Sequence, residues 1–173
     1  QQFGNVKPRI FRLEKDKALI NRLGFNNDGL EIVSQRLKKN LPSGVLGINI
    51  GPNKNTNDRI SDYLKCLEGL HNYSDYITIN ISSPNTEDLR SFHEQKKLNE
   101  LIQTIDKEKK KLNSNIPIAV KISPDIDDKE INKISEVLLS NNIEAIIISN
   151  TSDTNRELLK DIQKHQRGGL SGK

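Results

Sequence analysis

Hydroxyl and carboxamide side chains are crowded at the end of one short apolar stretch. Residues 76–81, Tyr-Ile-Thr-Ile-Asn-Ile, are β-branched or aromatic apart from Asn80, which predicts a short buried strand. The next residues, Ser-Ser-Pro-Asn at 82–85, cannot easily prolong a central strand, because the proline brings no N–H. A carboxamide offers both donors and an acceptor. The stretch is therefore either a polar turn after a core strand or a binding site at the strand's mouth.

The same pattern recurs along the chain. Residues 48–53 read Ile-Asn-Ile-Gly-Pro-Asn, and residues 120–125 read Val-Lys-Ile-Ser-Pro-Asp. Residues 146–151 keep the apolar strand and the polar end but lack the proline. Because side chains alternate along a strand, the polar residues of the first three strands should share one side of the sheet. They are Asn49, Asn80 and Lys121. Such an arrangement is typical of a site at the C-terminal face of a parallel barrel.

Strands and helices are expected to alternate around these motifs. Strands are predicted at residues 45–50, 76–81, 117–122 and 145–150. Helices are predicted at residues 15–22, 28–39, 96–112, 128–141 and 155–165, and also between a Thr56 cap and Leu70. Residues 1–12 should form a loop or an irregular edge, and residues 168–172 a flexible glycine-rich end. The strand spacing of about 30–40 residues indicates βαβ units and a parallel sheet.

Two architectures fit this order, a (β/α)8 barrel and an open doubly wound sheet. No Gly-x-Gly-x-x-Gly follows the first strand, which counts against a Rossmann nucleotide site. The repeated polar position favours the barrel. We therefore expect an α/β fold, a partial (β/α)8 TIM barrel with about four βα units, in which residues 1–173 are the central part of one domain. Four strands cannot close a barrel and the sequence contains no Met, so a fragment of a longer protein is expected.

Composition argues against several classes of function. Lys and Arg number 27 against 23 Asp and Glu, and the basic residues are spread over helices, so no nucleic-acid partner is expected. The single cysteine, Cys66, excludes an intramolecular disulfide and offers no second thiol for zinc, and no metal is expected. No run approaches the ~18 apolar residues of a membrane-spanning helix. His93 is expected to be solvated.

Six short motifs, in this order along the chain, resemble those of one family. They are Asn21-Arg22-Leu23-Gly24-Phe25, Gly47-Ile48-Asn49-Ile50-Gly51, Asn80-Ile81-Ser82-Ser83-Pro84-Asn85-Thr86, Val120-Lys121-Ile122, Ser149-Asn150-Thr151 and Gly168-Gly169-Leu170-Ser171-Gly172-Lys173. The family is class 2 dihydroorotate dehydrogenase, and the similarity covers essentially the whole chain. It implies an FMN-dependent (β/α)8 barrel of pyrimidine biosynthesis, which oxidises dihydroorotate to orotate and passes the electrons to a membrane quinone.

The resemblance also implies roles for single residues. Ser83 matches the catalytic base, which takes a proton from substrate C5 while hydride passes from C6 to flavin N5. A free serine is a poor base, so its neighbours or an ordered water must help. The substrate-binding matches are Asn21, Arg22, Leu23, Gly24, Phe25, Asn80, Asn85, Asn150 and Thr151. The flavin-binding matches are Asn49, Asn80, Lys121, Ser149 and Gly172. A lysine in such a place can stabilise negative charge on the reduced flavin.

Alternatives stay open for single residues and for the function. Lys121 could form a buried ion pair with a carboxylate, Asn49 could cap a turn, and Ser82 fits a backbone-bonding turn residue. A related FMN-dependent pyrimidine oxidoreductase would be expected to carry Cys in place of Ser83, as class 1 enzymes do. A non-catalytic half-barrel is the third hypothesis, although such a relic would be free to lose these polar residues.

The resemblance places further parts of the protein outside this sequence. In the family, the first barrel strands and the helices of the quinone tunnel would precede Gln1, and the loops that hold the FMN phosphate would follow Lys173. Peripheral membrane association is therefore expected through a missing N-terminal segment, at the cytoplasmic side of a bacterial inner membrane or at a mitochondrial inner membrane. The fragment alone should be inactive, because both edges of its sheet lack their neighbours.

Overall fold

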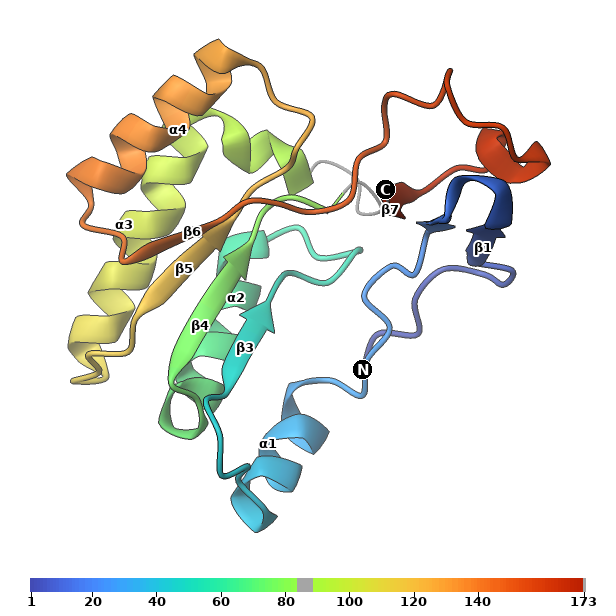
Figure 1. The fold of residues 1–173 in the computed structure, drawn as a ribbon. Helices are drawn as coiled ribbons and strands as arrows, with labels where there is room; N and C mark the ends of the chain where they lie inside the picture. The colour runs from blue at the N-terminus through green and yellow to red at the C-terminus, as the bar shows by residue number, and fades with distance from the viewer. Residues whose placement is uncertain (84–88, 173) are drawn as a thin grey trace.

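The structure, a computed structural model, describes residues 1–83 and 89–172. Its main unit is a four-stranded parallel sheet in the order β3 (Gly47–Ile50), β4 (Tyr76–Asn80), β5 (Ile118–Lys121) and β6 (Ala145–Ile147). Each strand pairs in parallel with the next strand along the chain. Figure 1 shows the carboxyl ends of these strands pointing toward a second, smaller sheet. This order of strands is the order that consecutive βα units of a barrel require.

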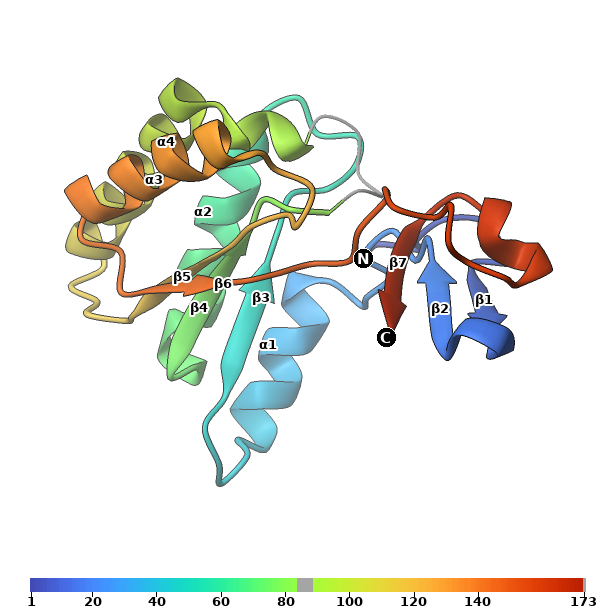
Figure 2. The ribbon, with the colours of Figure 1, turned by 45° about the horizontal axis from the view of Figure 1, so that its top comes forward.

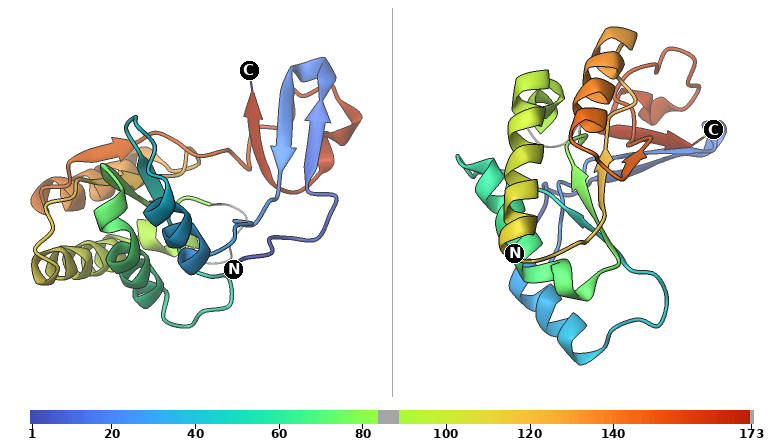
Figure 3. Two further views of the ribbon diagram at one scale, coloured as in Figure 1. Left: turned by 90° about the horizontal axis from the view of Figure 1, so that it is seen from below. Right: turned by 90° about the vertical axis from the view of Figure 1, so that its left-hand side faces the viewer.

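Helices cover one face of the parallel sheet. They are α1 (Leu30–Lys39), α2 (Arg59–Leu70), α3 (Gln95–Lys111) and α4 (Asp128–Ser140). Neighbouring helices pack against one another in chain order, and Figure 3 shows them on one side of the strands. Among the residues that the structure describes, no helix is long and apolar enough to cross a bilayer. The α/β prediction of a partial barrel is thus confirmed, with one change: β6 is followed by turns and not by an α-helix.

The main core lies between the parallel sheet and these helices. Ile77 and Ile79 of β4 are 0% exposed, and so is Val120 of β5. They pack with the apolar faces of the helices, which include Leu67, Leu98, Leu101, Ile102, Ile105, Ile134, Val137 and Leu138. Each such side chain contributes about 1.5–3 kcal/mol when it is removed from water. Since strand side chains alternate, this burial turns the polar residues of the strands toward the opposite face.

Capping residues set where two helices begin. The Asp58 carboxylate accepts a hydrogen bond from Ser61 N at 3.0 Å, so Asp58 caps α2. The prediction that Thr56 is the cap is therefore wrong. At α4, Asp127 and Glu130 form a reciprocal capping box. These two caps follow the loops at the carboxyl ends of β3 and β5, so they fix the exits of both loops.

A small antiparallel sheet lies beyond the strand ends and joins the two ends of the described chain. Its strands are β1 (Ile10–Leu13), β2 (Ala18–Asn21) and β7 (Gly169–Gly172), in the order β1-β2-β7 (Figure 2). The helix predicted at residues 15–22 is wrong. The first residues of this segment complete a 3-10 turn (η1, Glu14–Asp16), and the residues that follow form β2. The flexible end predicted at residues 168–172 is also wrong, since β7 pairs with β2.

The helix predicted at residues 155–165 is likewise wrong. Only a 3-10 turn, η4 (Ile162–His165), is present there, and a second such turn, η2 (His71–Tyr73), follows α2. The Asp16 carboxylate accepts hydrogen bonds from Lys160 N and Asp161 N, both at 2.9 Å. These bonds to a distant carboxylate replace the helical bonds that the local apolar spacing predicted. Leu159 then packs on the small core made by Phe11, Leu13 and Ile20.

Candidate active site

Polar side chains from neighbouring strands meet at the carboxyl end of the parallel sheet. Asn80 is the last residue of β4 and pairs with Lys121, the last residue of β5. Asn49 of β3 pairs with Thr78, the residue of β4 that points to the same face as Asn80 and precedes it in the strand. Ile50 and Ile79, the neighbours of these polar residues, are in the helix-side core. The predicted alternation thus puts Asn49, Asn80 and Lys121 on the face that the helices leave free.

Ser82 links the loop after β4 to the loop after β6. The Asn80 Oδ1 atom accepts hydrogen bonds from Ser82 N at 3.1 Å and from Ser82 Oγ at 2.8 Å. Asn150 Nδ2 in turn donates to Ser82 Oγ at 2.9 Å. Ser82 is 0% exposed and Asn80 3%. Ser82 therefore does more than the turn residue that the sequence suggested: its hydroxyl connects two carboxamides from different loops.

Ser83 follows directly and is buried, with 6% of its surface exposed. The backbone before it is held from behind, because the buried Tyr63 hydroxyl donates to Asn80 O at 2.7 Å. Burial raises the pKa of Tyr63, so its hydroxyl stays protonated and able to donate. Asn85, the other predicted residue of this loop, lies outside the described residues. The strand end that leads into Ser83 is thus held by a buried hydrogen bond.

The segment Ser149–Asn150–Thr151 lies against the end of β5. Asn150 N donates to Ile122 O at 3.2 Å, which continues the sheet pairing by one step. The Asn150 Oδ1 atom accepts from Thr151 N at 2.8 Å, while its Nδ2 group reaches Ser82. Ser149 Oγ donates to Asn150 O at 3.2 Å. The side-chain amide of Asn150 is therefore held at both its nitrogen and its oxygen.

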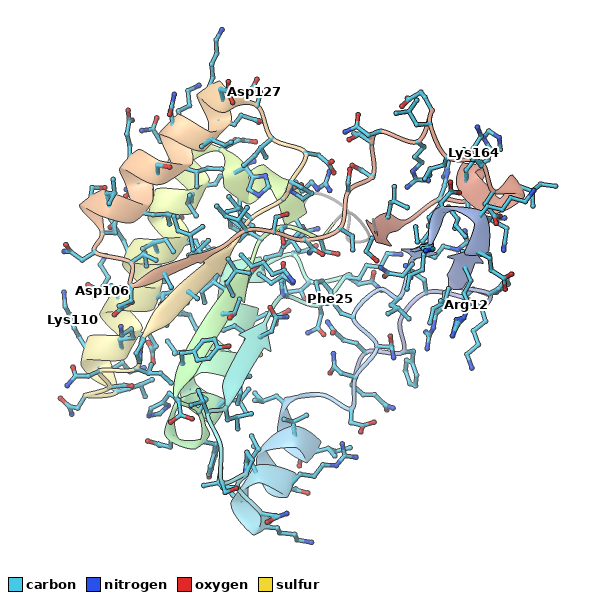
Figure 4. All side chains as sticks on the ribbon, viewed as in Figure 1. Arg12, Phe25, Asp106, Lys110, Asp127 and Lys164 are labelled. Carbon is cyan, nitrogen blue, oxygen red and sulfur yellow. The ribbon has the colours of Figure 1, made fainter. Side chains whose placement is uncertain are left out.

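Phe25 reaches the strand ends from the N-terminal part of the chain. A methyl group at Gly51, just after β3, would lie 4.0 Å from Phe25 Cζ and 3.9 Å from Asn80 O. The ring is therefore close to the end of β3 and to the backbone of β4. Figure 4 shows Phe25 between the parallel sheet and the small sheet. Phe25 can form an apolar wall there.

Arg22 does not extend toward the strand ends. Its guanidinium lies over the Phe11 ring, 4.5 Å from the ring centre, and its Nη1 donates to Gln166 Oε1 at 3.2 Å. The Asn21 Nδ2 group contacts Gly169 O at 3.5 Å, across the β2–β7 pair. Arg22 thus holds the small sheet to the segment before β7, and through it the loop that ends at Phe25.

The glycines of two predicted motifs have clear conformational reasons. Gly24 has a φ of +72°, and a methyl group on it would lie 2.9 Å from the Asn5 side chain. The preceding Leu23 O accepts a hydrogen bond from Asn5 N at 2.9 Å. Gly172 has a φ of +135°, and a methyl group on it would lie 2.6 Å from Ala18 Cα. Both positions therefore need glycine to let two backbone segments approach.

Among the residues that the structure describes, Lys121 and Asn49 have none of the partners that a purely structural role would require. Within residues 1–83 and 89–172, the Lys121 ammonium has no hydrogen bond and no carboxylate within salt-bridge distance. Asn49 lies within β3, and its exposed side chain caps no turn among the described residues. Neither the ion pair nor the turn cap that the sequence left open is present within residues 1–83 and 89–172.

Sequence reasoning missed a charged cluster beside this site. Asp125 lies in the loop after β5. Its carboxylate accepts hydrogen bonds from Arg90 and from three residues of the loop after β6, which are Ser152, Asp153 and Thr154. Burial by itself raises the pKa of the Asp125 carboxyl, but hydrogen bonds from Asp153, Ser152 and Thr154 outweigh it and hold that pKa well below its ordinary value. The only signal in the sequence was Asp125 itself, the acidic residue after the proline in residues 120–125.

His93 was expected to be solvated, and this is wrong. The ring is 7% exposed, within a 3-10 helix, η3 (Leu89–His93), that packs on α3. Burial lowers the pKa of His93, and the positive charge of Arg90 lowers it further, so the imidazole is neutral near pH 7. Burial of a short polar turn against a helix cannot be read from local spacing.

The fold and the cluster of polar residues at its strand ends define a protein of the (β/α)8-barrel class. The sequence profile of one family, described as dihydroorotate dehydrogenase, matches residues 1–173. The chain belongs to this family, as the six motifs predicted.

Curated relatives agree with this assignment. A "Dihydroorotate dehydrogenase (quinone)" of Idiomarina loihiensis is 44% identical over 178 residues, covering 99% of this chain and 53% of that protein. One of Bartonella tribocorum is 43% identical over 176 residues, covering 99% of this chain and 49% of that protein. The chain therefore spans about half the length of the curated relatives it matches.

Solved structures show the same likeness. The crystal structure of the Eimeria tenella enzyme in complex with ferulenol superposes with a TM-score of 0.94 at 37% identity, covering 99% of this chain and 53% of that one. The ligand-free form gives 0.93 at 38% identity, covering 99% and 54%. The arrangement of strands and helices is thus that of about half of a known dihydroorotate dehydrogenase barrel.

Proposed function

We propose that the protein to which these residues belong oxidises dihydroorotate to orotate, with FMN as its prosthetic group and a quinone as electron acceptor, in the synthesis of UMP. The observation that carries the proposal is Ser83, buried at the carboxyl end of β4 beside the linked carboxamides of Asn80 and Asn150. The relatives are named dihydroorotate dehydrogenase (quinone), which supports the same reaction.

The donors and acceptors around Ser83 suit a small planar substrate with ring amides and a carboxylate. Asn80 and Asn150 come from different strand ends and are held by one hydroxyl, so their remaining hydrogen-bonding groups are fixed in direction. Asn21, Asn85 and Thr151 are assigned to the same substrate on their match to the family's motif. Phe25 forms the apolar wall, while Leu23 and Gly24 shape the loop that carries it.

The residues present also fit a flavin. Lys121 offers an ammonium without a carboxylate partner among the described residues, and Asn49 offers an exposed carboxamide on the same face. A positive charge beside the flavin ring stabilises the negative charge of its reduced form. Ser149 and Gly172 are assigned to the same cofactor. When bound, FMN supplies the hydride acceptor and the relay of electrons to quinone.

Ser83 acts as the base in this proposal. Its Oγ takes the proton from C5 of dihydroorotate and passes its own proton to a neighbouring group or an ordered water, because an unassisted serine is a weak base. Burial of the Ser83 side chain excludes bulk water from this step. We assign Arg22 to holding the loop of Phe25, since its guanidinium is engaged in the small sheet.

The site of action follows from the acceptor. A quinone is dissolved in the bilayer, so we propose a peripheral membrane protein, at a bacterial inner membrane on its cytoplasmic side or at a mitochondrial inner membrane. The contact with the membrane is assigned to a segment that precedes these residues in the full protein. The domain is a single FMN-binding barrel, of which residues 1–173 form the central part.

Anaerobic mixing of the full-length protein with dihydroorotate tests the proposal. The flavin absorbance should bleach in a single turnover, and a short-chain quinone should restore it. Fumarate and NAD serve as soluble control acceptors and should restore it far more slowly. A flavin that stays oxidised with dihydroorotate, or one that reacts best with a soluble acceptor, would contradict the assignment.

A further inference from the structure

We propose that Asp125 is a positioning residue for the reaction: it ties η3, the segment that resumes the described chain after Ser83, to the loop that carries Asn150 and Thr151. The inference rests on the proposed function and adds a residue to it. Asp125 lies in the loop after β5, between the loops that follow β4 and β6. It belongs to none of the motif positions assigned to substrate or flavin.

Both oxygens of the Asp125 carboxylate accept two hydrogen bonds. Oδ1 accepts from Ser152 Oγ in a very short contact and from Thr154 Oγ1 at 2.9 Å. Oδ2 accepts from Asp153 N at 2.9 Å and from Arg90 Nη2 at 3.0 Å. Three of the four donors belong to the loop that directly follows Thr151. A single carboxylate therefore holds three consecutive residues next to the proposed substrate contacts.

Arg90 connects the same carboxylate to η3. It is the second residue of η3, which resumes the described chain after Ser83. Its Nη1 also donates to Asp153 Oδ1 at 3.0 Å, so one guanidinium bridges two carboxylates. The segment η3 and the loops after β5 and β6 are thus joined by one set of charged hydrogen bonds, which are stronger than neutral ones.

This cluster differs from the ion pairs elsewhere on the described surface. The Asp125 side chain is 6% exposed and that of Arg90 28%, whereas those of Lys110 and Asp106 on α3 are 77% and 52% exposed. A buried carboxylate with four donors cannot exchange them for water without cost, so it fixes their positions. Exposed pairs such as Lys110–Asp106 contribute little.

Catalysis is sensitive to such positioning. A displacement of about 1 Å in a reacting group can cost on the order of 10²-fold in rate. Ser83 and Asn150 come from different loops, and Ser82, next to Ser83 in the chain, is hydrogen-bonded to Asn150. The Asp125 cluster adds a charged connection between η3 and the loop that follows Thr151.

Asp125→Asn in the full-length enzyme tests the inference, since it keeps the shape and removes the charge. Reduction of the flavin by dihydroorotate should slow by roughly 10-fold or more, with a raised KM for dihydroorotate. Reoxidation by quinone of flavin that dithionite has reduced should keep its rate, and the flavin spectrum should not change. A purely structural role would not separate the two half-reactions in this way.

Matched variants complete the test. Asp106→Asn removes an exposed ion pair at the far end of α3 (Figure 4) and should change neither half-reaction. Arg90→Lys should recover part of the rate that Arg90→Gln loses. The double variant Arg90→Gln/Asp125→Asn should lose less than the product of the single losses, because both act through one contact. If Asp125→Asn does not fold, Thr154→Val removes one donor and should give a smaller effect of the same kind.

The outcomes separate this inference from the proposed function. Normal reduction by dihydroorotate in Asp125→Asn, or an equal loss in both half-reactions, would overturn the positioning role. A wild-type flavin that dihydroorotate does not reduce would instead overturn the proposed function.

Discussion

At the scale of single residues, two adjacent serines differ in what surrounds them. Ser82 is fixed between Asn80 and Asn150, whereas Ser83 continues the buried strand end toward the loop of Asn85. We therefore assign the Ser82 hydroxyl to orienting the two carboxamides proposed to bind the substrate, and the Ser83 hydroxyl to accepting the substrate proton. The two serines should give different kinetic losses when each is replaced.

Ser83→Ala in the full-length enzyme should leave FMN bound and slow flavin reduction by dihydroorotate by roughly 10²-fold or more, the scale of a lost general base. Ser82→Ala is the comparison, and it should mainly raise KM, because it frees the two carboxamides. Stopped-flow absorbance under anaerobic conditions measures both. An unchanged rate of reduction in Ser83→Ala would remove Ser83 from the role of base.

Lys121→Gln should weaken FMN retention and lower the reduction potential of the flavin, because a positive charge near the ring favours its anionic reduced form. Lys121→Arg keeps the charge and should shift the potential less. Spectroelectrochemical titration gives the potentials, and dialysis gives the retention. If the potentials of Lys121→Gln and the wild type coincide, Lys121 does not contact the flavin.

The local sequence pattern predicts correctly those side chains whose direction is fixed by alternation along a strand. Asn49, Asn80 and Lys121 were placed correctly by alternation alone, since their isoleucine neighbours had to enter the core. Asp125 and His93 were not, because their burial depends on which loops meet. Ser82 and Asn150, joined by a hydrogen bond, are 68 positions apart, and no local pattern encodes that contact.

At the scale of elements, the parallel strands were predictable and the small sheet was not. The apolar runs of β3 to β6 fit buried strands and recur with helices between them. The segment Ala18–Asn21 has residues that suit a helix as well as a strand, and its pairing with Gly169–Gly172 at the other end of the chain decides the matter. Long-range pairing thus overrides local preference in this lobe.

Gly172→Ala should destabilise the small sheet. The alanine would have to adopt a φ of +135° and its methyl group would lie 2.6 Å from Ala18 Cα, so the cost should be about 1–3 kcal/mol. Gly44→Ala is the matched control, since a methyl group there meets nothing within 4 Å, and it should be nearly neutral. Thermal unfolding of both variants in the full-length protein decides, and equal melting temperatures would contradict the strain.

At the scale of the whole molecule, the Asp125 cluster should make stability depend on acidic pH. The pKa of Asp125 is lower in the folded protein than in an unfolded chain, where an aspartate titrates near about 3.9. The folded state is therefore stabilised at full strength above that pH, and the contribution is lost as pH falls toward the lower folded pKa. Denaturant unfolding from pH 6 down to 3 should show the onset of this loss below about pH 4, and Asp125→Asn should show a shallower dependence. Parallel curves for the two proteins would contradict it.

The last prediction concerns residues 1–173 expressed alone. β3 and β6 are the outer strands of the parallel sheet, and each has one neighbour within the described residues. Both outer edges carry unpaired backbone donors and acceptors, a setting that favours edge pairing and aggregation. Beside them, Val45 is 82% exposed and Ile148 81%.

The loss of burial is large compared with the stability of a domain. Each uncovered large apolar side chain costs about 1.5–3 kcal/mol, and a domain's net stability is only about 5–15 kcal/mol. We therefore expect purified residues 1–173 to be colourless, inactive and aggregated or loosely folded, whereas the full-length protein prepared in parallel should be yellow. Size-exclusion chromatography and the visible spectrum test this. A soluble, yellow monomer that oxidises dihydroorotate would refute the need for barrel closure, because half of the strands would then suffice to hold both the flavin and Ser83.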